Sequence, residues 1–241
     1  MEGSAATAAT KYRRAAARIN YVAQDRPDIA VAANQLARSM AVPREGDEKG
    51  IKRLIRYLAG SPRCVYVYRY QTEPTVIDVM SDSDWAGCRA TRRSTSGGAV
   101  LHGSHLLLHW SKMQSNVALS SGEAELSAQV KGVSEGLCVR NVAKDLGVEL
   151  RLRTHADSSA ARGILNRVGV GKLKHLEVKH LWVQDLVKTK QVESVKVSRL
   201  SNPSDILTHP CSVQDMRAHL RNLCMSVRPA LVIGAVEYNS D

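Results

Sequence analysis

The sequence contains no phenylalanine and few other aromatic residues, with three Trp and seven Tyr among 241 residues. Its core must therefore be built mainly from Leu, Val, Ile and Ala. A hydrophobic share of 44% is enough for such a core and argues against a largely disordered chain. The scarcity of rings also argues against nucleic-acid binding by base stacking. The length fits one large domain, or one domain and a fragment.

The five cysteines are scattered, and no Cys-x-x-Cys pair occurs. This argues against a disulfide framework and a cysteine-ligated zinc site, and it fits a reducing compartment. Basic side chains stand where a signal peptide would need an apolar segment, and no apolar run approaches the roughly 20 residues of a membrane span. We therefore expect an intracellular protein, cytoplasmic or nuclear, with no membrane partner. Without a Gly-x-Ser-x-Gly motif, a serine hydrolase has no support.

Positive charge is in excess, with 34 Lys and Arg against 23 Asp and Glu, a net charge of +11. Both residues 1–74 and residues 75–225 have more basic than acidic side chains. This distribution favours a polyanionic partner. The alternative is a basic surface that is merely solvated.

The spacing of apolar residues predicts helices within residues 11–60 and a short strand at 65–68. From residue 75 the pattern becomes β-branched and apolar, which predicts strands at 75–81, 96–102 and 106–111, the last two as a hairpin. Ser120 and Glu123 form a capping box that opens a long helix. The elements predicted after it are strand 150–156, helix 158–168, helix 176–190, strand 192–198 and helix 213–223.

This order predicts an α/β fold, with a mixed five-stranded sheet flanked by helices and preceded by a small helical segment. We divide the chain into a helical connection segment at residues 1–74, a main domain at 75–225 and a tail at 226–241. Trp85 and Trp110 are expected in the core.

Two aspartates end predicted strands: Asp82 follows the first strand and Asp157 the fourth. If these strands are parallel neighbours, both carboxylates emerge at the same edge of the sheet. Glu125 lies one turn into the long helix, and Asp205 follows a proline-containing turn. Clustered carboxylates repel unless a cation neutralises them, and oxygen ligands of this kind suit Mg²⁺ or Mn²⁺. Two such ions promote phosphodiester cleavage.

A simpler interpretation applies to each acid taken alone. An Asp at a strand end is usually a turn or cap residue, and Asp205 in particular has the sequence context of a helix N-cap. Glu123 is expected to be the capping glutamate, which leaves Glu125 for the site.

Several sequence blocks occur in a fixed order: Ser81–Gly87 with Arg92–Gly98, Trp110–Ser115 with Ala118–Leu126, Ala156–Ala160, Lys174–His180 and Ser204–Thr208. Together they resemble the ribonuclease H domain of copia-type LTR retrotransposon (retrovirus-related) Pol polyproteins. The resemblance implies a ribonuclease H-like mixed five-stranded sheet, two Mg²⁺ or Mn²⁺ ions, and an RNA–DNA hybrid cut endonucleolytically in its RNA strand. The acidic tetrad of the family maps onto Asp82, Glu125, Asp157 and Asp205, with Asp84 and Glu123 excluded.

Upstream blocks also match this family: Tyr12–Arg14, Ile19–Val22, Arg26–Ala30 and Ile55–Gly60 resemble the segment that joins reverse transcriptase to ribonuclease H. The reverse transcriptase portion of the same polyprotein is therefore an implied partner. The Tyr-x-Asp-Asp polymerase motif is absent, so we expect no polymerisation by this chain. Ser158, Ser159 and His209 differ from the usual family residues (for His209, a lysine) and leave substrate contacts there open.

Basic residues near these blocks are candidate phosphate contacts: Arg89, Arg92, Arg93, Lys112, Lys172, Lys174, His175 and Lys179. A ribonuclease H recognises the hybrid by shape, backbone and 2′-hydroxyl groups, so no base-specific contacts are expected. His175 and His180 either shuttle protons or only pack and cap. Two functions follow: a metal-dependent hybrid ribonuclease, or an inactive remnant that binds nucleic acid without cutting it. A purely structural fragment is a third option.

Overall fold

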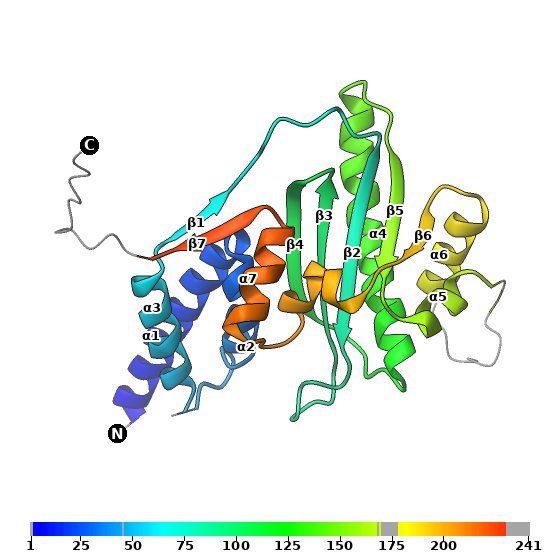
Figure 1. Ribbon diagram of the computed structural model, residues 1–241. Coiled ribbons are helices and arrows are strands. Elements are labelled where there is room, and N and C mark those ends of the chain that lie inside the picture. Colours follow the sequence, from blue (N-terminus) through cyan, green and yellow to red (C-terminus); the bar gives the residue numbers. More distant parts are fainter. Residues whose placement is uncertain (1, 45, 168, 170–177, 230–241) are drawn as a thin grey trace, which may run out of the picture.

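The computed structural model describes residues 2–44, 46–167, 169 and 178–229. The chain begins with a helical segment of α1 (Glu2–Val22), α2 (Ala30–Arg38) and α3 (Asp47–Gly60), with the short 3-10 helices η1 (Ala23–Asp25) and η2 (Pro27–Ile29) between the first two (Figure 1). Apolar residues at helical spacing, among them Tyr12, Ile19 and Leu54, form a small core of their own. None of the described helices is long and apolar enough to cross a membrane.

A five-stranded sheet forms the centre of the molecule. Its strands are β2 (Val76–Asp84), β3 (Thr95–His102), β4 (His105–Met113), β5 (Arg151–Ala156) and β6 (Glu193–Lys196). They lie in the order β4-β3-β2-β5-β6. β3 runs antiparallel to both of its neighbours, β2 and β4, whereas β2, β5 and β6 are parallel. The predicted mixed sheet, its hairpin and the parallel pairing of the first and fourth strands are confirmed.

One face of the sheet is covered by the long helix α4 (Ser121–Asp145), with α5 (Ser159–Leu165) and α6 (Val178–Lys188) beyond it (Figure 1). Ser120 caps α4 as predicted, because its Oγ accepts a hydrogen bond from the backbone N–H of Glu123. The helix packs closely on the sheet at Gly136, where a Cβ would lie 2.6 Å from the side chain of Val79. Buried aliphatic residues such as Ile77, Leu126 and Leu152 fill this interface.

The opposite face is covered by η4 (Pro203–Leu207) and α7 (Val213–Asn222), with η3 (Arg199–Ser201) just before them. Their core includes Leu101, Leu207 and Leu220, and it also takes in Ala30 and Tyr66 from the helical segment. The helical segment and the sheet therefore share apolar contacts.

Two short strands, β1 (Arg63–Tyr66) and β7 (Met225–Arg228), pair antiparallel at the side of the helical segment (Figure 1). The end of the main domain thus returns to the first part of the chain. β7 runs past residue 225, across the predicted start of the tail, and residues 230–241 lie outside the described part. The division into 1–74, 75–225 and 226–241 stays a prediction.

Candidate active site

The fold brings the four predicted carboxylates together from four separate elements. Asp82 lies in β2 and Asp157 directly follows β5, and because these strands are parallel neighbours their ends meet at one edge of the sheet. Glu125 comes from the first turns of α4, and Asp205 comes from η4. Carboxylate oxygens of Asp82, Glu125 and Asp157 lie within 4.8 Å of one another.

A second set of possible ligand atoms shares one of these acids. An oxygen of Asp82, an oxygen of Asp205 and a ring nitrogen of His209 also lie within 4.8 Å of one another. Asp82 therefore belongs to both sets and lies at the centre of the site.

Two of the carboxyl groups are nearly buried, since Asp82 and Glu125 are each 8% exposed. Burial, together with the neighbouring charges of Asp82 and Asp157, raises the pKa of Glu125 to about 9. Burial also raises the pKa of Asp82, and the carboxylates of Asp205 and Asp157 add to this, while a hydrogen bond from Thr208 opposes it. Burial and mutual repulsion thus disfavour the simultaneous ionisation of these carboxyl groups.

The two carboxylate oxygens of Glu125 differ in their hydrogen bonding. Glu125 Oε1 accepts a hydrogen bond from the backbone N–H of Ser83 at 3.2 Å. Glu125 Oε2 is buried and has no hydrogen-bond partner among the described residues. A buried oxygen without a partner, beside two more carboxylates, fits the ligand preference of a divalent ion such as Mg²⁺ or Mn²⁺.

The alternative interpretation of Asp205, as a helix N-cap, is wrong. Asn202 is the N-cap of η4, because its Oδ1 accepts a hydrogen bond from the backbone N–H of Ser204. Its Nδ2 donates to the carbonyl oxygen of Ser81 at 3.0 Å, which fastens η4 to β2. Asp205, free of the capping role, lies inside η4 and lines the carboxylate cavity.

The same cavity of about 300 Å³ is also lined by residues outside the predicted tetrad, among them Trp85, Arg199 and His209. Asp84, which the resemblance excluded from the tetrad, lines it as well. Trp85 is 49% exposed, so its expected place in the core is wrong, whereas Trp110 packs against the core. Arg199 Nε lies 3.6 Å from Asp205 Oδ1. Two features of the sequence could have pointed to these cavity residues: Trp85 lies inside the first family block, and His209 follows Asp205 by four residues.

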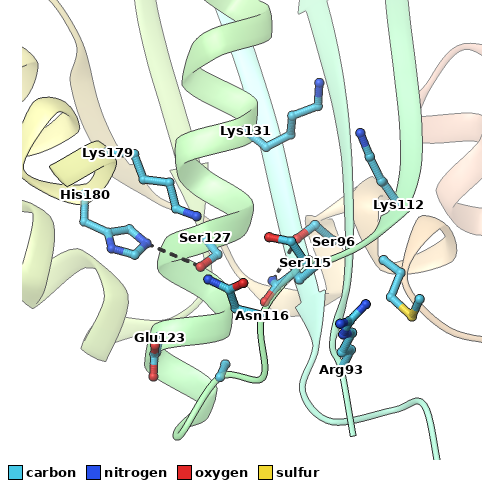
Figure 2. A pocket seen from close by; sticks show the side chains of 13 residues that line it. Arg93, Ser96, Lys112, Ser115, Asn116, Glu123, Ser127, Lys131, Lys179 and His180 are labelled. Atoms are coloured by element: carbon cyan, nitrogen blue, oxygen red, sulfur yellow. Dashed lines mark hydrogen bonds between the residues drawn. The ribbon is translucent and has the colours of Figure 1, made fainter. Parts of the chain in front are cut away.

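A second cavity, of about 320 Å³, lies between β4 and α4, and its basic lining is shown in Figure 2. Lys112 and Arg93 reach it from the strand side, and Lys131 and Lys179 from the helix side (Figure 2). Three of the predicted phosphate contacts therefore meet here with Lys131, for which no sequence motif gave a signal.

The remaining residues that were predicted to contact phosphate are either away from the basic cavity or outside the described residues. Arg89 and Arg92 are exposed on the loop between β2 and β3 and are not among the residues that line either cavity. Lys172, Lys174 and His175 lie outside the described residues. His180 is 2% exposed and lies 3.4 Å from Ser127 Oγ through its Nε2, so it packs at the basic cavity rather than at the carboxylates (Figure 2).

Comparison with known sequences finds relatives over most of the chain. A retrovirus-related Pol polyprotein from transposon RE1 of Arabidopsis thaliana is 31% identical over 213 residues, which is 87% of this chain and 14% of that protein. The corresponding polyprotein from transposon TNT 1-94 of Nicotiana tabacum is 28% identical over 76% of this chain and 14% of its own length. The chain thus spans about one seventh of these relatives. No profile of a known protein family matches it.

Among solved structures, LC11-RNase H1, isolated from compost by a metagenomic approach, aligns with 56% of this chain and 93% of its own, at 16% identity and a TM-score of 0.44. The prototype foamy virus protease-reverse transcriptase aligns with 66% of this chain and 22% of its own, at 12% identity and a TM-score of 0.33.

Proposed function

Because this chain belongs with the retrovirus-related Pol polyproteins of copia-type transposons, as a homologue of one segment of them, we propose that it is a ribonuclease that hydrolyses the RNA strand of an RNA–DNA hybrid endonucleolytically. The observation that carries the proposal is the convergence of four carboxylates, two of them nearly buried, on one edge of the sheet.

In this proposal Asp82, Glu125, Asp157 and Asp205 hold two divalent ions, Mg²⁺ or Mn²⁺. When bound, such a pair supplies activation of a water nucleophile and stabilisation of the departing 3′ oxygen. The chain's own contribution is to hold the ligands in place from rigid elements. Thr208 does so directly, since its hydroxyl donates to Asp82 Oδ2 at 2.7 Å and thereby fixes the orientation of that carboxylate.

The basic cavity is the proposed contact for the backbone of the hybrid. Arg93, Lys112, Lys131 and Lys179 present positive charge in a hollow of the surface, and Glu123 and Ser127 at the base of α4 line it too. Contacts of this kind bind phosphate without reading sequence. The hybrid is therefore recognised by its backbone and its groove shape.

The helical segment is the proposed link to the reverse transcriptase portion of the polyprotein. It contacts the sheet through Arg38, whose Nη2 donates to Thr95 Oγ1 at 2.9 Å, and through Asn34, whose Nδ2 donates to Ser111 Oγ at 3.3 Å. Such contacts would fix the position of the carboxylate site relative to a polymerase that precedes it in the same polypeptide.

The proposal is tested by cleavage of an end-labelled RNA–DNA hybrid in Mg²⁺, and separately in Mn²⁺, by the wild-type chain and by Asp82→Asn. We expect cleavage of the RNA strand by the wild type and a loss of at least a hundredfold in Asp82→Asn, because a shared ligand of both ions is removed. Asp185→Asn, an exposed acid on α6, is the matched control and should cleave like the wild type.

Salt-dependent binding of the hybrid by the wild type without cleavage in either metal would instead identify an inactive nucleic-acid-binding remnant. Equal cleavage by the wild type and Asp82→Asn would show that the carboxylate site is not the catalytic centre.

A further inference from the structure

His209 and Asp205 both line the carboxylate cavity. The two residues are four apart, and His209 Nε2 lies 3.6 Å from Asp205 Oδ2. This separation is too long for a hydrogen bond. It is compatible with two atoms that bind one ion, since metal–ligand bonds of about 2 Å place neighbouring ligands roughly 3 Å or more apart. An oxygen of Asp82 completes the set, with all three atoms within 4.8 Å of one another.

The hydrogen bond at His209 Nδ1 determines whether Nε2 has a lone pair that can bind an ion. Its Nδ1 lies 3.0 Å from Thr208 Oγ1. That hydroxyl has one proton, and two acceptors already face it: Asp82 Oδ2 at 2.7 Å and the backbone oxygen of Asp205 at 2.9 Å. In the neutral ring Nδ1 must therefore be the donor to Thr208, which leaves the lone pair on Nε2, the nitrogen on the side of Asp205. Metal-binding histidines are held in the same way by a partner on the opposite nitrogen.

A separate observation is that one buried carboxylate oxygen of the site lacks a hydrogen-bond partner among the described residues. This oxygen is Oε2 of Glu125, a residue that is 8% exposed. Glu125 belongs to the other ligand set, which shares Asp82 with His209. The two sets together provide ligand atoms for two ions, with a nitrogen in only one of them.

We propose that His209 is a nitrogen ligand of a divalent ion held with Asp82 and Asp205, and that this ligand gives the site a preference for Mn²⁺ over Mg²⁺. Mg²⁺ is bound almost entirely by oxygen, whereas imidazole nitrogen suits transition-metal ions. The inference rests on the ion site of the proposed function, and it adds the identity of a ligand and the selectivity that follows from it.

The test is pulsed electron paramagnetic resonance of the full chain titrated with Mn²⁺ alone. The wild type should show ¹⁴N coupling to bound Mn²⁺, and the coupling should disappear in His209→Gln and in His209→Lys. Calorimetric titration should show Mn²⁺ affinity about tenfold lower in His209→Gln, with Mg²⁺ affinity changed by less than about twofold. His105→Gln, at the far end of β4, is the control and should keep both the coupling and the affinity.

Three results separate this inference from the proposed function. Mn²⁺ binding without ¹⁴N coupling in the wild type would overturn the role of His209 and leave the carboxylate site intact. Absence of Mn²⁺ binding at millimolar concentration would overturn the ion site as a whole. Coupling that depends on His209 in a protein that fails to cut the hybrid would support the ligand assignment and contradict only the catalytic proposal.

Discussion

At the scale of single residues, the site depends on carboxyl groups placed where their charge is unfavourable without a cation. Asp82 and Asp157 could be paired from the sequence, because aspartates that end parallel strands must meet at one sheet edge. Asp205 could be assigned only through the resemblance. His209 had only its spacing from Asp205 as a signal, and Arg199 and Lys131 had none, since their positions depend on how η3, η4 and α4 pack against the sheet.

Glu125 makes the unfolding free energy of the ion-free protein depend on pH. Its pKa is about 9 in the folded state, against an ordinary value of 4.5. Between these values the folded state holds a proton that the unfolded state has lost, so stability falls as the pH rises through this window. Glu125→Gln removes that proton equilibrium. Denaturant unfolding in EDTA should show a flatter pH profile and a gain of about 1–3 kcal/mol at pH 8.

The exposed Glu149, in the loop between α4 and β5, provides the matched comparison. Glu149→Gln should retain the pH profile of the wild type. If Glu125→Gln instead loses stability at pH 8, Glu125 is ionised and favourably paired in the folded state, and the repulsion that we infer within the site does not exist.

At the scale of elements, the strands and long helices were predictable because each carries its own periodic pattern, and α4 also carries its capping residues. η4 was not predictable, because a 3-10 helix of five residues is too short to show a periodic pattern of apolar residues and is held by contacts with distant parts of the sequence. Asn202 donates to Ser81, 121 residues away in the sequence. The pairing of β1 with β7 has the same origin, since each strand is only four residues long and finds its partner at the other end of the chain.

Gly97 in β3 determines how closely η4 approaches the sheet. A Cβ at this position would lie 2.7 Å from the backbone carbon of Leu207, which cannot move without shifting η4. Gly97→Ala should therefore draw Asp205 and Thr208 away from Asp82. We expect a loss of about 1–3 kcal/mol in unfolding free energy and weaker binding of Mn²⁺ by calorimetry.

Gly163 in α5 is the control for this substitution, because a Cβ there meets no atom within 4 Å. Gly163→Ala should leave Mn²⁺ binding unchanged and raise the unfolding free energy by up to about 1 kcal/mol, as expected for alanine in a helix. Unchanged ion binding in Gly97→Ala would mean that the position of η4 does not set the ligand geometry.

At the scale of the whole molecule, the helical segment and the sheet are expected to unfold together, because they share a core and the β1–β7 pair. The helical segment is itself held by a buried ion pair: Arg26 Nη2 lies 2.7 Å from Asp28 Oδ2, and the hydroxyl of Tyr57 donates to the same oxygen at 2.6 Å. Asp28→Asn leaves a buried guanidinium without a counter-charge, which should cost about 3–5 kcal/mol.

The three tryptophans all lie beyond residue 75, so their fluorescence reports on the sheet region alone, whereas circular dichroism reports on every helix. We expect Asp28→Asn to lower both thermal midpoints together. The exposed Asp25 is the control, and Asp25→Asn should leave both close to the wild type. An early transition seen only by circular dichroism would show that the segments unfold independently.

The central claim, that these acids form one site for two divalent ions against a hybrid backbone, is tested most directly by manganese-edge anomalous diffraction. The crystal would contain the full chain, Mn²⁺ and a hybrid whose RNA strand is made uncleavable by 2′-O-methyl groups. We predict two anomalous peaks about 4 Å apart, both in contact with Asp82, one beside Glu125 and the other beside Asp205. An ordered hybrid with no anomalous peak among these carboxylates would contradict the account.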